Sequence, residues 1–253
     1  MKCTVITAVF NRVDTIGLSM DSIHSQTYNN IEHIVIDGLS SDGTVEVVAN
    51  RIRNQDVLIS EKDMGIYDAL NKGLNNATGD VIVFLHSDDV FANNQVVENV
   101  MKTFCSDCLD IVYGDASFFQ RENFFQDVRV YRSGAFSKSR LSWGWMPAHP
   151  ALFIKKSIYD KCGLFKIDYK IAADYEYLCR VVSVPLLSTK YIPKIFVRMQ
   201  MGGVSTSGIK NTWVLNKEVI RACGENKIDT NLLKILSKYP LKALEKCRPI
   251  KFF

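Results

Sequence analysis

The sequence predicts an α/β fold built on a mostly parallel β-sheet that is covered by helices on both faces. Two observations favour it. In the first half of the chain, apolar segments rich in β-branched residues alternate with helical patterns at the spacing of βαβ units. These segments are apolar along most of their length, as strands buried on both faces are. The 253 residues are enough for one large domain.

Four strands are expected in the first half of the chain. They are the segments CTVITAVF, IEHIVID, DVLISE and DVIVFLH, at residues 3–10, 31–37, 56–61 and 80–86. A helical pattern runs through Ile23 after the first strand, and a second helix follows the turn at residues 38–43. The third helix falls within residues 64–79, where Gly79 is expected to be its C-terminal cap.

The second half is less regular. Strands are expected at residues 111–120 and 124–132, the second of them at a sheet edge, and again at residues 189–199. A loop rich in aromatic residues, LSWGWMPAHPALF, lies between them, and a helix is expected to start near Ala173. Two further helices are expected at the C-terminal end.

The composition is that of an ordinary globular protein, with 47% hydrophobic and 23% charged residues. No apolar run approaches the roughly 18 residues that a membrane span needs. Asn11 and Arg12 interrupt the first apolar segment too early for a signal peptide. The seven cysteines are an odd, scattered set, which favours reduced thiols in a cytosol over a disulfide framework. A lone Cys-x-x-Cys at residues 105–108 does not predict a zinc site.

The net charge of +4 is unevenly distributed along the chain. From Lys227 onward the tail carries seven basic residues and two acidic ones, so the rest of the chain is close to neutral. A near-neutral body argues against a nucleic-acid-binding protein, whereas the basic tail suits contact with an anionic surface.

Aspartates follow two of the predicted parallel strands at their carboxyl ends, where ligands bind in sheets of this kind. Asp37 ends the second strand, and Asp88 and Asp89 follow the fourth. No G-x-G-x-x-G or G-x-x-x-x-G-K-[ST] loop is present to hold phosphates. A divalent cation that bridges carboxylates to phosphate oxygens is the expected substitute. The alternative is that the pair lies in a solvated turn.

Four segments carry a family resemblance: TVITAVFNR, HIVIDGLSSDGT, SEKDMGIYDALNKGLNNATGDVIVFLHSDD and AADYEYLCR. In this order and spacing they resemble the family 2 inverting glycosyltransferases of bacterial polysaccharide biosynthesis, over roughly residues 1–205. The resemblance implies the GT-A fold, a Rossmann-like, mostly parallel central sheet flanked by helices, with a smaller acceptor-side sheet and C-terminal helices. It implies a catalytic domain at residues 1–210, with a nucleotide-sugar half at 1–115 and an acceptor half at 116–210. A basic helical extension follows at 211–253.

The resemblance also implies the donor-binding residues. Ala8 and Phe10 would lie along the nucleobase, Asp37 would accept a hydrogen bond from the base or ribose, and Asp63 would be a second base contact. Two local explanations compete with these roles. Asp37 is followed by glycine, as turn aspartates often are, and Asp63 is placed to cap the following helix.

The paired aspartates take separate roles in the same resemblance. Asp88 would hold the ribose or assist the metal, and Asp89 would coordinate Mn²⁺ or Mg²⁺ directly. Because the leaving group is then a metal-bound diphosphate, the protein needs to supply only a general base for the acceptor hydroxyl.

Asp174 matches the aspartate of the family's Glu-Asp motif, although Ala173 stands where the family often has glutamate. Glu176 is the second candidate for the base. Residues two apart on a helix point about 200° away from each other, so both cannot face one sugar. An acidic residue in the first turn that only stabilises the helix dipole is the structural alternative for Asp174.

The aromatic loop is the expected acceptor platform, with Trp143 and Trp145 stacking on a sugar and His149 binding the acceptor or a phosphate. Packing in the protein interior is the alternative for all three. Lys62 and Arg198 are candidate partners of the diphosphate. The glycine-rich segment at Met201–Gly208 is either a loop that closes over the donor or an ordinary linker.

The expected activity is a metal-dependent, inverting transfer of a sugar from a UDP-sugar to a saccharide acceptor on a lipid diphosphate, in surface polysaccharide assembly in the cytoplasm. The leucines and lysines of residues 231–253 suit a helix on the inner membrane surface or one packed on the body. A sugar nucleotidyltransferase is the first alternative, but TAVFNRVDT lacks its glycine-rich basic loop. A non-catalytic sugar- or nucleotide-binding module is the second, and it would not need Asp174.

Overall fold

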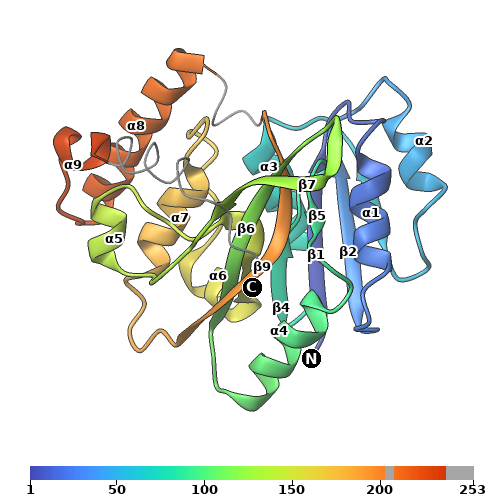
Figure 1. Ribbon diagram of the computed structural model, residues 1–253, viewed down its shortest axis with the longest axis horizontal. Coiled ribbons are helices and arrows are strands. Elements are labelled where there is room, and N and C mark those ends of the chain that lie inside the picture. Colours follow the sequence, from blue (N-terminus) through green and yellow to red (C-terminus); the bar gives the residue numbers. More distant parts are fainter. Residues whose placement is uncertain (203–207, 238–253) are drawn as a thin grey trace.

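The computed structural model describes residues 1–202 and 208–237 of the chain. Within them, helices pack on both faces of one nine-stranded sheet (Figure 1). The strand order is β3-β2-β1-β4-β8-β6-β9-β5, and β7 pairs with β6.

The first half of the chain forms the parallel part of the sheet, as predicted. Its elements in chain order are β1 (Cys3–Val9), α1 (Ile16–His24), β2 (Ile31–Asp37), α2 (Thr44–Ala49), β3 (Val57–Ser60), α3 (Ile66–Asn76) and β4 (Val81–Phe84). Strands β3, β2, β1 and β4 run parallel to one another, so their carboxyl ends share one edge.

The second half extends the same sheet with mixed pairings. Its first elements are β5 (Val90–Phe91), α4 (Val96–Ser106), β6 (Ile111–Gln120), β7 (Asn123–Tyr131), α5 (Lys138–Ser142), the 3₁₀ turn η1 (His149–Ala151) and β8 (Leu152–Lys155). The remaining elements are α6 (Lys156–Cys162), α7 (Ala173–Val181), β9 (Thr189–Gln200), α8 (Gly208–Glu225) and α9 (Leu232–Leu236). Strands β5, β6, β7 and β9 are joined to the four parallel strands of the first half through β8.

Each face of the sheet buries its own core. Alternate residues of β1 show this, since Ile6 packs with α3, α7 and α8, whereas Val5 packs with α4 and Val9 with α1. In Figure 1, helices α5, α7, α8 and α9 gather at one end of the molecule, and α1 and α2 lie at the other.

The cap predicted at Gly79 is wrong. Helix α3 ends at Asn76, and Ala77 after it is already extended. Gly79 serves a different purpose, because its amide donates to Thr4 Oγ1 at 3.0 Å and an added Cβ would lie 2.5 Å from that oxygen. A side chain at this position would push the start of β4 away from β1.

The C-terminal helices pack on the body as far as they are described. Val219, Ala222 and Cys223 of α8 are buried in the core cluster that includes α7. In α9, Ile235 is fully buried, while Leu233 is 81% exposed. Residues 238–253, on which much of the membrane-contact prediction rests, lie outside the described residues. Within the described ranges, no helix has both the length and the apolar character needed to cross a membrane.

Candidate active site

Asp37 is fully buried at the carboxyl end of β2. Its Oδ2 accepts hydrogen bonds from the Ser40 amide at 3.0 Å and from Ser60 Oγ at 2.7 Å. Its Oδ1 is buried without a hydrogen-bond partner among the described residues. A buried carboxylate oxygen without a donor is costly, and a ligand N–H or O–H would satisfy it.

Phe10 and Asp63 lie against the residue that follows Asp37. A Cβ placed on Gly38 would be 2.5 Å from Asp63 Oδ2 and 3.4 Å from the Phe10 ring. Phe10 is 57% exposed, so its ring offers a surface to a ligand. Ala8 differs, since its side chain is mostly buried in the core beneath α3.

The capping alternative for Asp63 is not what the structure has. Gly65 occupies the N-cap position of α3, and within the described residues the Asp63 carboxylate accepts a hydrogen bond from the Gly65 amide alone, at 2.9 Å. Asp63 therefore braces the turn before the helix and leaves the first helical amides unbonded by its side chain.

Asp88 and Asp89 lie in the turn that joins β4 to β5. Asp89 is 2% exposed, and its Oδ1 accepts a hydrogen bond from the Gln200 amide at 3.1 Å. Burial first, and then the neighbouring charge of Asp88, raises the pKa of Asp89 well above its ordinary value. Neither carboxylate forms an ion pair with a lysine or arginine in the part of the chain that the structure describes. Two adjacent carboxylates without a cation are the donor set that Mn²⁺ or Mg²⁺ prefers, so the residues present fit a divalent ion.

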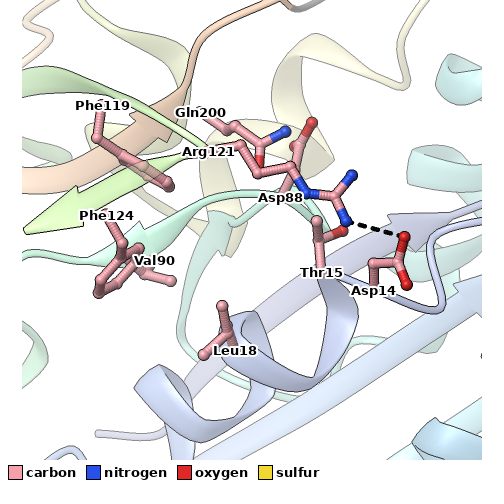
Figure 2. Close-up of a pocket in the computed structure, with 9 residues that line it drawn as sticks. All are labelled: Asp14, Thr15, Leu18, Asp88, Val90, Phe119, Arg121, Phe124 and Gln200. Carbon is pink, nitrogen blue, oxygen red and sulfur yellow. Dashed lines mark hydrogen bonds and ion pairs between the residues drawn. The ribbon is translucent and has the colours of Figure 1, made fainter.

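Asp88 also lines a pocket between the start of α1, the β6–β7 hairpin and the end of β9 (Figure 2). Arg121 from the hairpin reaches across it to Asp14, with 2.9 Å between Nη2 and Oδ2. The other residues that line it are Thr15, Leu18, Val90, Phe119, Phe124 and Gln200.

The two predicted diphosphate partners lie in different settings. Arg198 forms an ion pair with Asp127 at 2.9 Å, and its guanidinium lies over the rings of Phe119 and Phe124. The positive charge of Arg198 is therefore already paired within the protein. Lys62 is exposed just before Asp63. Of the predicted closing segment Met201–Gly208, residues 203–207 lie outside the described part of the chain.

Asp174 is the second residue of α7 and is partly buried. Its Oδ1 accepts from the Tyr175 amide at 2.8 Å and lies 3.5 Å from the Tyr67 hydroxyl. Burial is the main cause that raises the pKa of Asp174, to about 6, and the nearby charge of Glu218 adds to it. A carboxylate with this pKa is ionised at neutral pH yet basic enough to accept a proton from a hydroxyl in a transition state.

Glu176, the second candidate for the base, is fully buried in an ion cluster. Its carboxylate pairs with Arg180 at 2.9 Å and with Lys166 at 3.0 Å. Glu176 is therefore paired with two cations. It points to a different side of α7 from Asp174, as its spacing of two residues along the helix predicts.

Two residues that position Asp174 lie far from it in the sequence, so the segment around Asp174 does not predict them. Tyr67, in the first turn of α3, donates to the Ile171 carbonyl just before α7. Glu218 of α8 accepts from the amides of Lys170, Ile171 and Ala172, at 2.7, 2.9 and 2.9 Å. Because α3 begins at the carboxyl edge of the sheet, these contacts put Asp174 at the same edge as Asp37, Asp63 and the Asp88–Asp89 pair.

The aromatic residues of the predicted acceptor platform are divided between surface and interior. Trp143 is 44% exposed. Trp145 stacks on Tyr131, with ring centroids 6.2 Å apart, and lies beside Arg140. His149 is 9% exposed and stacks on Phe84 at 5.2 Å; burial lowers its pKa to about 3, so the ring is neutral at pH 7.

Known glycosyltransferases are similar to this chain over most of its length. A protein from Mycobacterium tuberculosis described as "PGL/p-HBAD biosynthesis glycosyltransferase" is 27% identical over 222 residues, which cover 86% of this chain and 82% of that protein. The "UDP-Glc:alpha-D-GlcNAc-diphosphoundecaprenol beta-1,3-glucosyltransferase" of Escherichia coli is 25% identical over 228 residues, with 87% and 86% covered.

Solved structures with little sequence identity share the fold. Staphylococcus aureus TarS (residues 1–349) in complex with UDP-GlcNAc superposes with a TM-score of 0.69 at 16% identity, covering 88% of this chain and 66% of that chain. The mannosyltransferase PcManGT from Pyrobaculum calidifontis, in complex with GDP-Man and Mn²⁺, gives a TM-score of 0.59 at 18% identity, with 96% and 80% covered.

The family model described as "Glycosyl transferase family 2" matches residues 4–161, a span that contains the Phe10–Asp37–Asp63 group and the Asp88–Asp89 pair. The match covers more than half of the chain and includes strands β2, β3 and β4 and all but the first residue of β1. This chain belongs to glycosyl transferase family 2 and is a glycosyltransferase.

Proposed function

We propose that this glycosyltransferase is metal-dependent and inverting, and that it moves a sugar from a UDP-sugar to a saccharide carried on a lipid diphosphate. The observation that carries the proposal is Asp174, a partly buried carboxylate with a pKa of about 6 at the sheet edge that also bears Asp88 and Asp89. An inverting transfer needs one such base on the acceptor side.

The donor is held by residues of the first half of the chain. Asp37 Oδ1, which has no hydrogen-bond partner among the described residues, accepts a hydrogen bond from the base or ribose, and Asp63 accepts a second. The exposed ring of Phe10 lies along the base, beside Ala8. Asp89, assisted by Asp88, would hold the divalent ion, which supplies positive charge to the diphosphate as it leaves.

Asp174 acts on the acceptor. Its carboxylate accepts the proton of the acceptor hydroxyl while that oxygen bonds to the anomeric carbon, and the bond between this carbon and the diphosphate oxygen breaks on the opposite face. The Tyr67 hydroxyl and the Glu218-bound turn hold the carboxylate in one orientation. Trp143, Trp145 and His149 are the proposed acceptor side of the site.

Relatives support the choice of substrates. The E. coli relative is named for a UDP-sugar donor and a diphosphoundecaprenol acceptor, and the structural neighbour TarS was solved with UDP-GlcNAc. PcManGT was solved with Mn²⁺. An acceptor of this kind suits work at the cytoplasmic face of a membrane in surface polysaccharide assembly, with the basic tail against anionic lipid.

A screen of UDP-, GDP- and dTDP-sugars with Mn²⁺ or Mg²⁺ tests the proposal. One UDP-sugar is expected to raise the melting temperature and to release UDP slowly by hydrolysis, only with the metal. In Asp89→Asn, the metal-dependent part of UDP binding should be lost in calorimetry. Stabilisation by GDP- or dTDP-sugars alone would reject the UDP assignment, and unchanged metal dependence in Asp89→Asn would remove Asp89 from the site. Release of pyrophosphate from UTP and a sugar 1-phosphate would instead identify a nucleotidyltransferase.

A further inference from the structure

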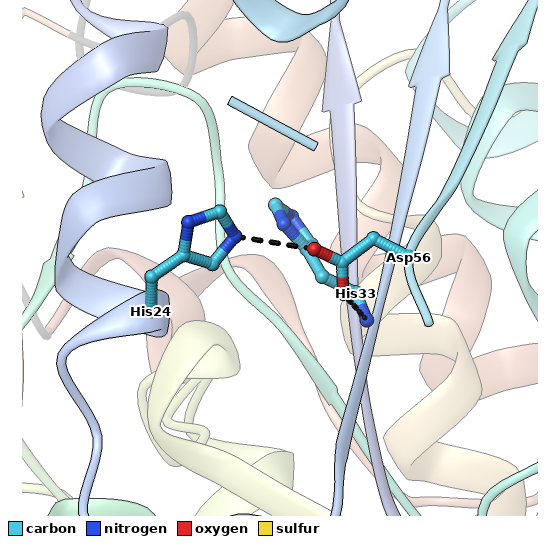
Figure 3. A group of neighbouring side chains, drawn as sticks. All are labelled: His24, His33 and Asp56. Atoms are coloured by element: carbon cyan, nitrogen blue, oxygen red, sulfur yellow. Dashed lines mark hydrogen bonds and ion pairs between the residues drawn. The ribbon is translucent and has the colours of Figure 1, made fainter. Parts of the chain in front are cut away.

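A group of side chains whose atoms could hold a metal ion lies at the opposite edge of the parallel sheet (Figure 3). His24 ends α1, His33 is in the first half of β2, and Asp56 immediately precedes β3. One nitrogen of each histidine and one Asp56 carboxylate oxygen all lie within 4.8 Å of one another. This edge holds the amino-terminal ends of the strands, away from Asp37, Asp89 and Asp174.

Each histidine has a buried nitrogen without a regular hydrogen bond among the described residues, at His24 Nε2 and His33 Nδ1, although His24 Nε2 lies within ion-pair distance of Asp56. His33 is fully buried, and its other nitrogen, Nε2, lies 3.0 Å from Thr7 Oγ1. If the ring donates to Thr7 through Nε2, its Nδ1 lone pair is left without a proton donor. Metal-bound histidines commonly have this arrangement, with one nitrogen on the ion and the other held by a neighbouring oxygen.

The ion pair between His24 and Asp56 accounts for only part of the cluster. His24 Nε2 lies 3.3 Å from Asp56 Oδ2, but the carboxylate already accepts from Arg53 Nε at 2.9 Å, Arg53 Nη2 at 3.0 Å and the Arg53 amide at 3.0 Å. The Asp56 charge is therefore balanced without His24. Among the described residues, no hydrogen-bond partner compensates for the burial of His33 Nδ1.

We propose that His24 Nε2, His33 Nδ1 and Asp56 Oδ2 form a site for a divalent transition metal such as Zn²⁺, with water as the remaining ligand. Two imidazoles and a carboxylate suit such an ion and do not suit Mg²⁺ or Ca²⁺, which prefer oxygen ligands. Zinc bonds of about 2.0–2.1 Å in a tetrahedron put ligand atoms roughly 3.3–3.4 Å apart. The 3.3 Å between His24 and Asp56 has this value.

The site is accessible from solvent, and a bound ion would connect three elements of the fold. The His24 side chain is 19% exposed, so the ion can enter from that side. A bound ion would join the end of α1 to β2 and to the start of β3, and Arg53 would orient the carboxylate from behind. The expected role is therefore to stabilise the donor-binding half of the chain, separately from the ion at Asp89.

Zn²⁺ titration of the whole chain by calorimetry and thermal melting tests the site. Cys105 and Cys108 are exposed free thiols, so all proteins in the series carry Cys105→Ser and Cys108→Ser to exclude Zn²⁺ binding by thiols at these two positions. One equivalent of Zn²⁺ should bind and raise the melting temperature, and Co²⁺ should give the visible absorption of a tetrahedral complex. Added Mg²⁺ should compete with neither ion.

Two variants decide where the ion binds. His24→Gln, at a partly exposed position, is expected to melt near the wild-type temperature without metal and to lose the Zn²⁺ equivalent and the Co²⁺ absorption. Asp89→Asn should keep both. An unchanged Zn²⁺ equivalent in His24→Gln, or no saturable Zn²⁺ binding in the parent protein, would overturn the proposal.

Discussion

Strand β2 carries one carboxylate near each end, Glu32 at the amino-terminal edge of the sheet and Asp37 at the carboxyl edge, and the two are bonded very differently. Glu32 accepts four hydrogen bonds, from Lys2 Nζ, Thr4 Oγ1, the Thr78 amide and Thr78 Oγ1, at 2.6–2.9 Å. Asp37 is buried just as deeply, yet one of its oxygens has no partner among the described residues.

The carboxylates at the two edges of the sheet also differ in the direction of their pKa shifts. Burial by itself would raise the pKa of Glu32, but its hydrogen bonds from Lys2, Thr4 and Thr78 outweigh burial and lower the pKa to about 2. At the carboxyl edge, burial prevails, and the pKa values of Asp89 and Asp174 are raised. The carboxylate at the amino-terminal edge thus stabilises the fold. The carboxylates at the carboxyl edge have fewer hydrogen-bond donors and can bind a substrate or an ion.

The largest expected effect is at Asp174. Asp174→Asn keeps the shape of the side chain and removes the proposed base, so turnover should fall by about 10²–10⁴-fold. Donor affinity should change only a few-fold, since the proposed donor contacts lie in the first half of the chain. The measurements are UDP release with acceptor and calorimetry with the donor. Near-normal turnover would show that the base is another group.

The same substitution, Asp174→Asn, should lower turnover but leave the stability of the fold unchanged or raise it. The folded-state pKa of Asp174 is raised from 3.8 to about 6, so its ionisation destabilises the fold as pH rises from about 4 to about 6, and the loss is complete above that value. Asp174→Asn is therefore expected to melt at or above the wild-type temperature at pH 8, with a smaller difference at pH 4. A lower melting temperature at pH 8 would show that the charge is well stabilised in the folded protein.

Glu32→Gln should have the next largest effect, on folding. The substitution removes the charge that four donors share, and the loss should be about 2–3 kcal/mol in the free energy of unfolding. Because the folded-state pKa of Glu32 is lowered, this contribution is present above its ordinary value near 4.5 and is lost as pH falls toward about 2. Urea unfolding at pH 7 and pH 3 measures both points.

Activity is the control for Glu32→Gln. Turnover per folded molecule should be unchanged, because Glu32 lies at the edge away from Asp174. A large loss of turnover in protein that is still folded would mean that the two edges are coupled.

The smallest expected effect is a shift in a pH profile. Turnover should fall tenfold per pH unit below about 6, as Asp174 becomes protonated. The Tyr67 hydroxyl favours the ionised form, so Tyr67→Phe should move this acid limb to higher pH, by roughly a few tenths of a unit. An unshifted limb would mean that Tyr67 acts only through its bond to the Ile171 carbonyl.

Much of the parallel half of the fold could be predicted because its signals are local. Mostly apolar segments mark β1, β2 and β4, and the aspartates at the ends of β2 and β4 are placed by the direction of the strands. The error at Gly79 has a tertiary cause, since the residue is needed for the close approach of Thr4. Nothing next to Gly79 in the sequence reveals that contact.

The sequence by itself determined which residues follow the parallel strands, Asp37 and the Asp88–Asp89 pair, and, through the family's motif, it identified Asp174 at the start of helix α7. Only the tertiary structure decided the surroundings that set their chemistry. Tyr67 and Asp174 are 107 residues apart, and His24, His33 and Asp56 meet only when α1 packs on the sheet. Burial and hydrogen-bond partners come from such distant contacts, and they determine whether a carboxylate stabilises the fold or remains available for catalysis.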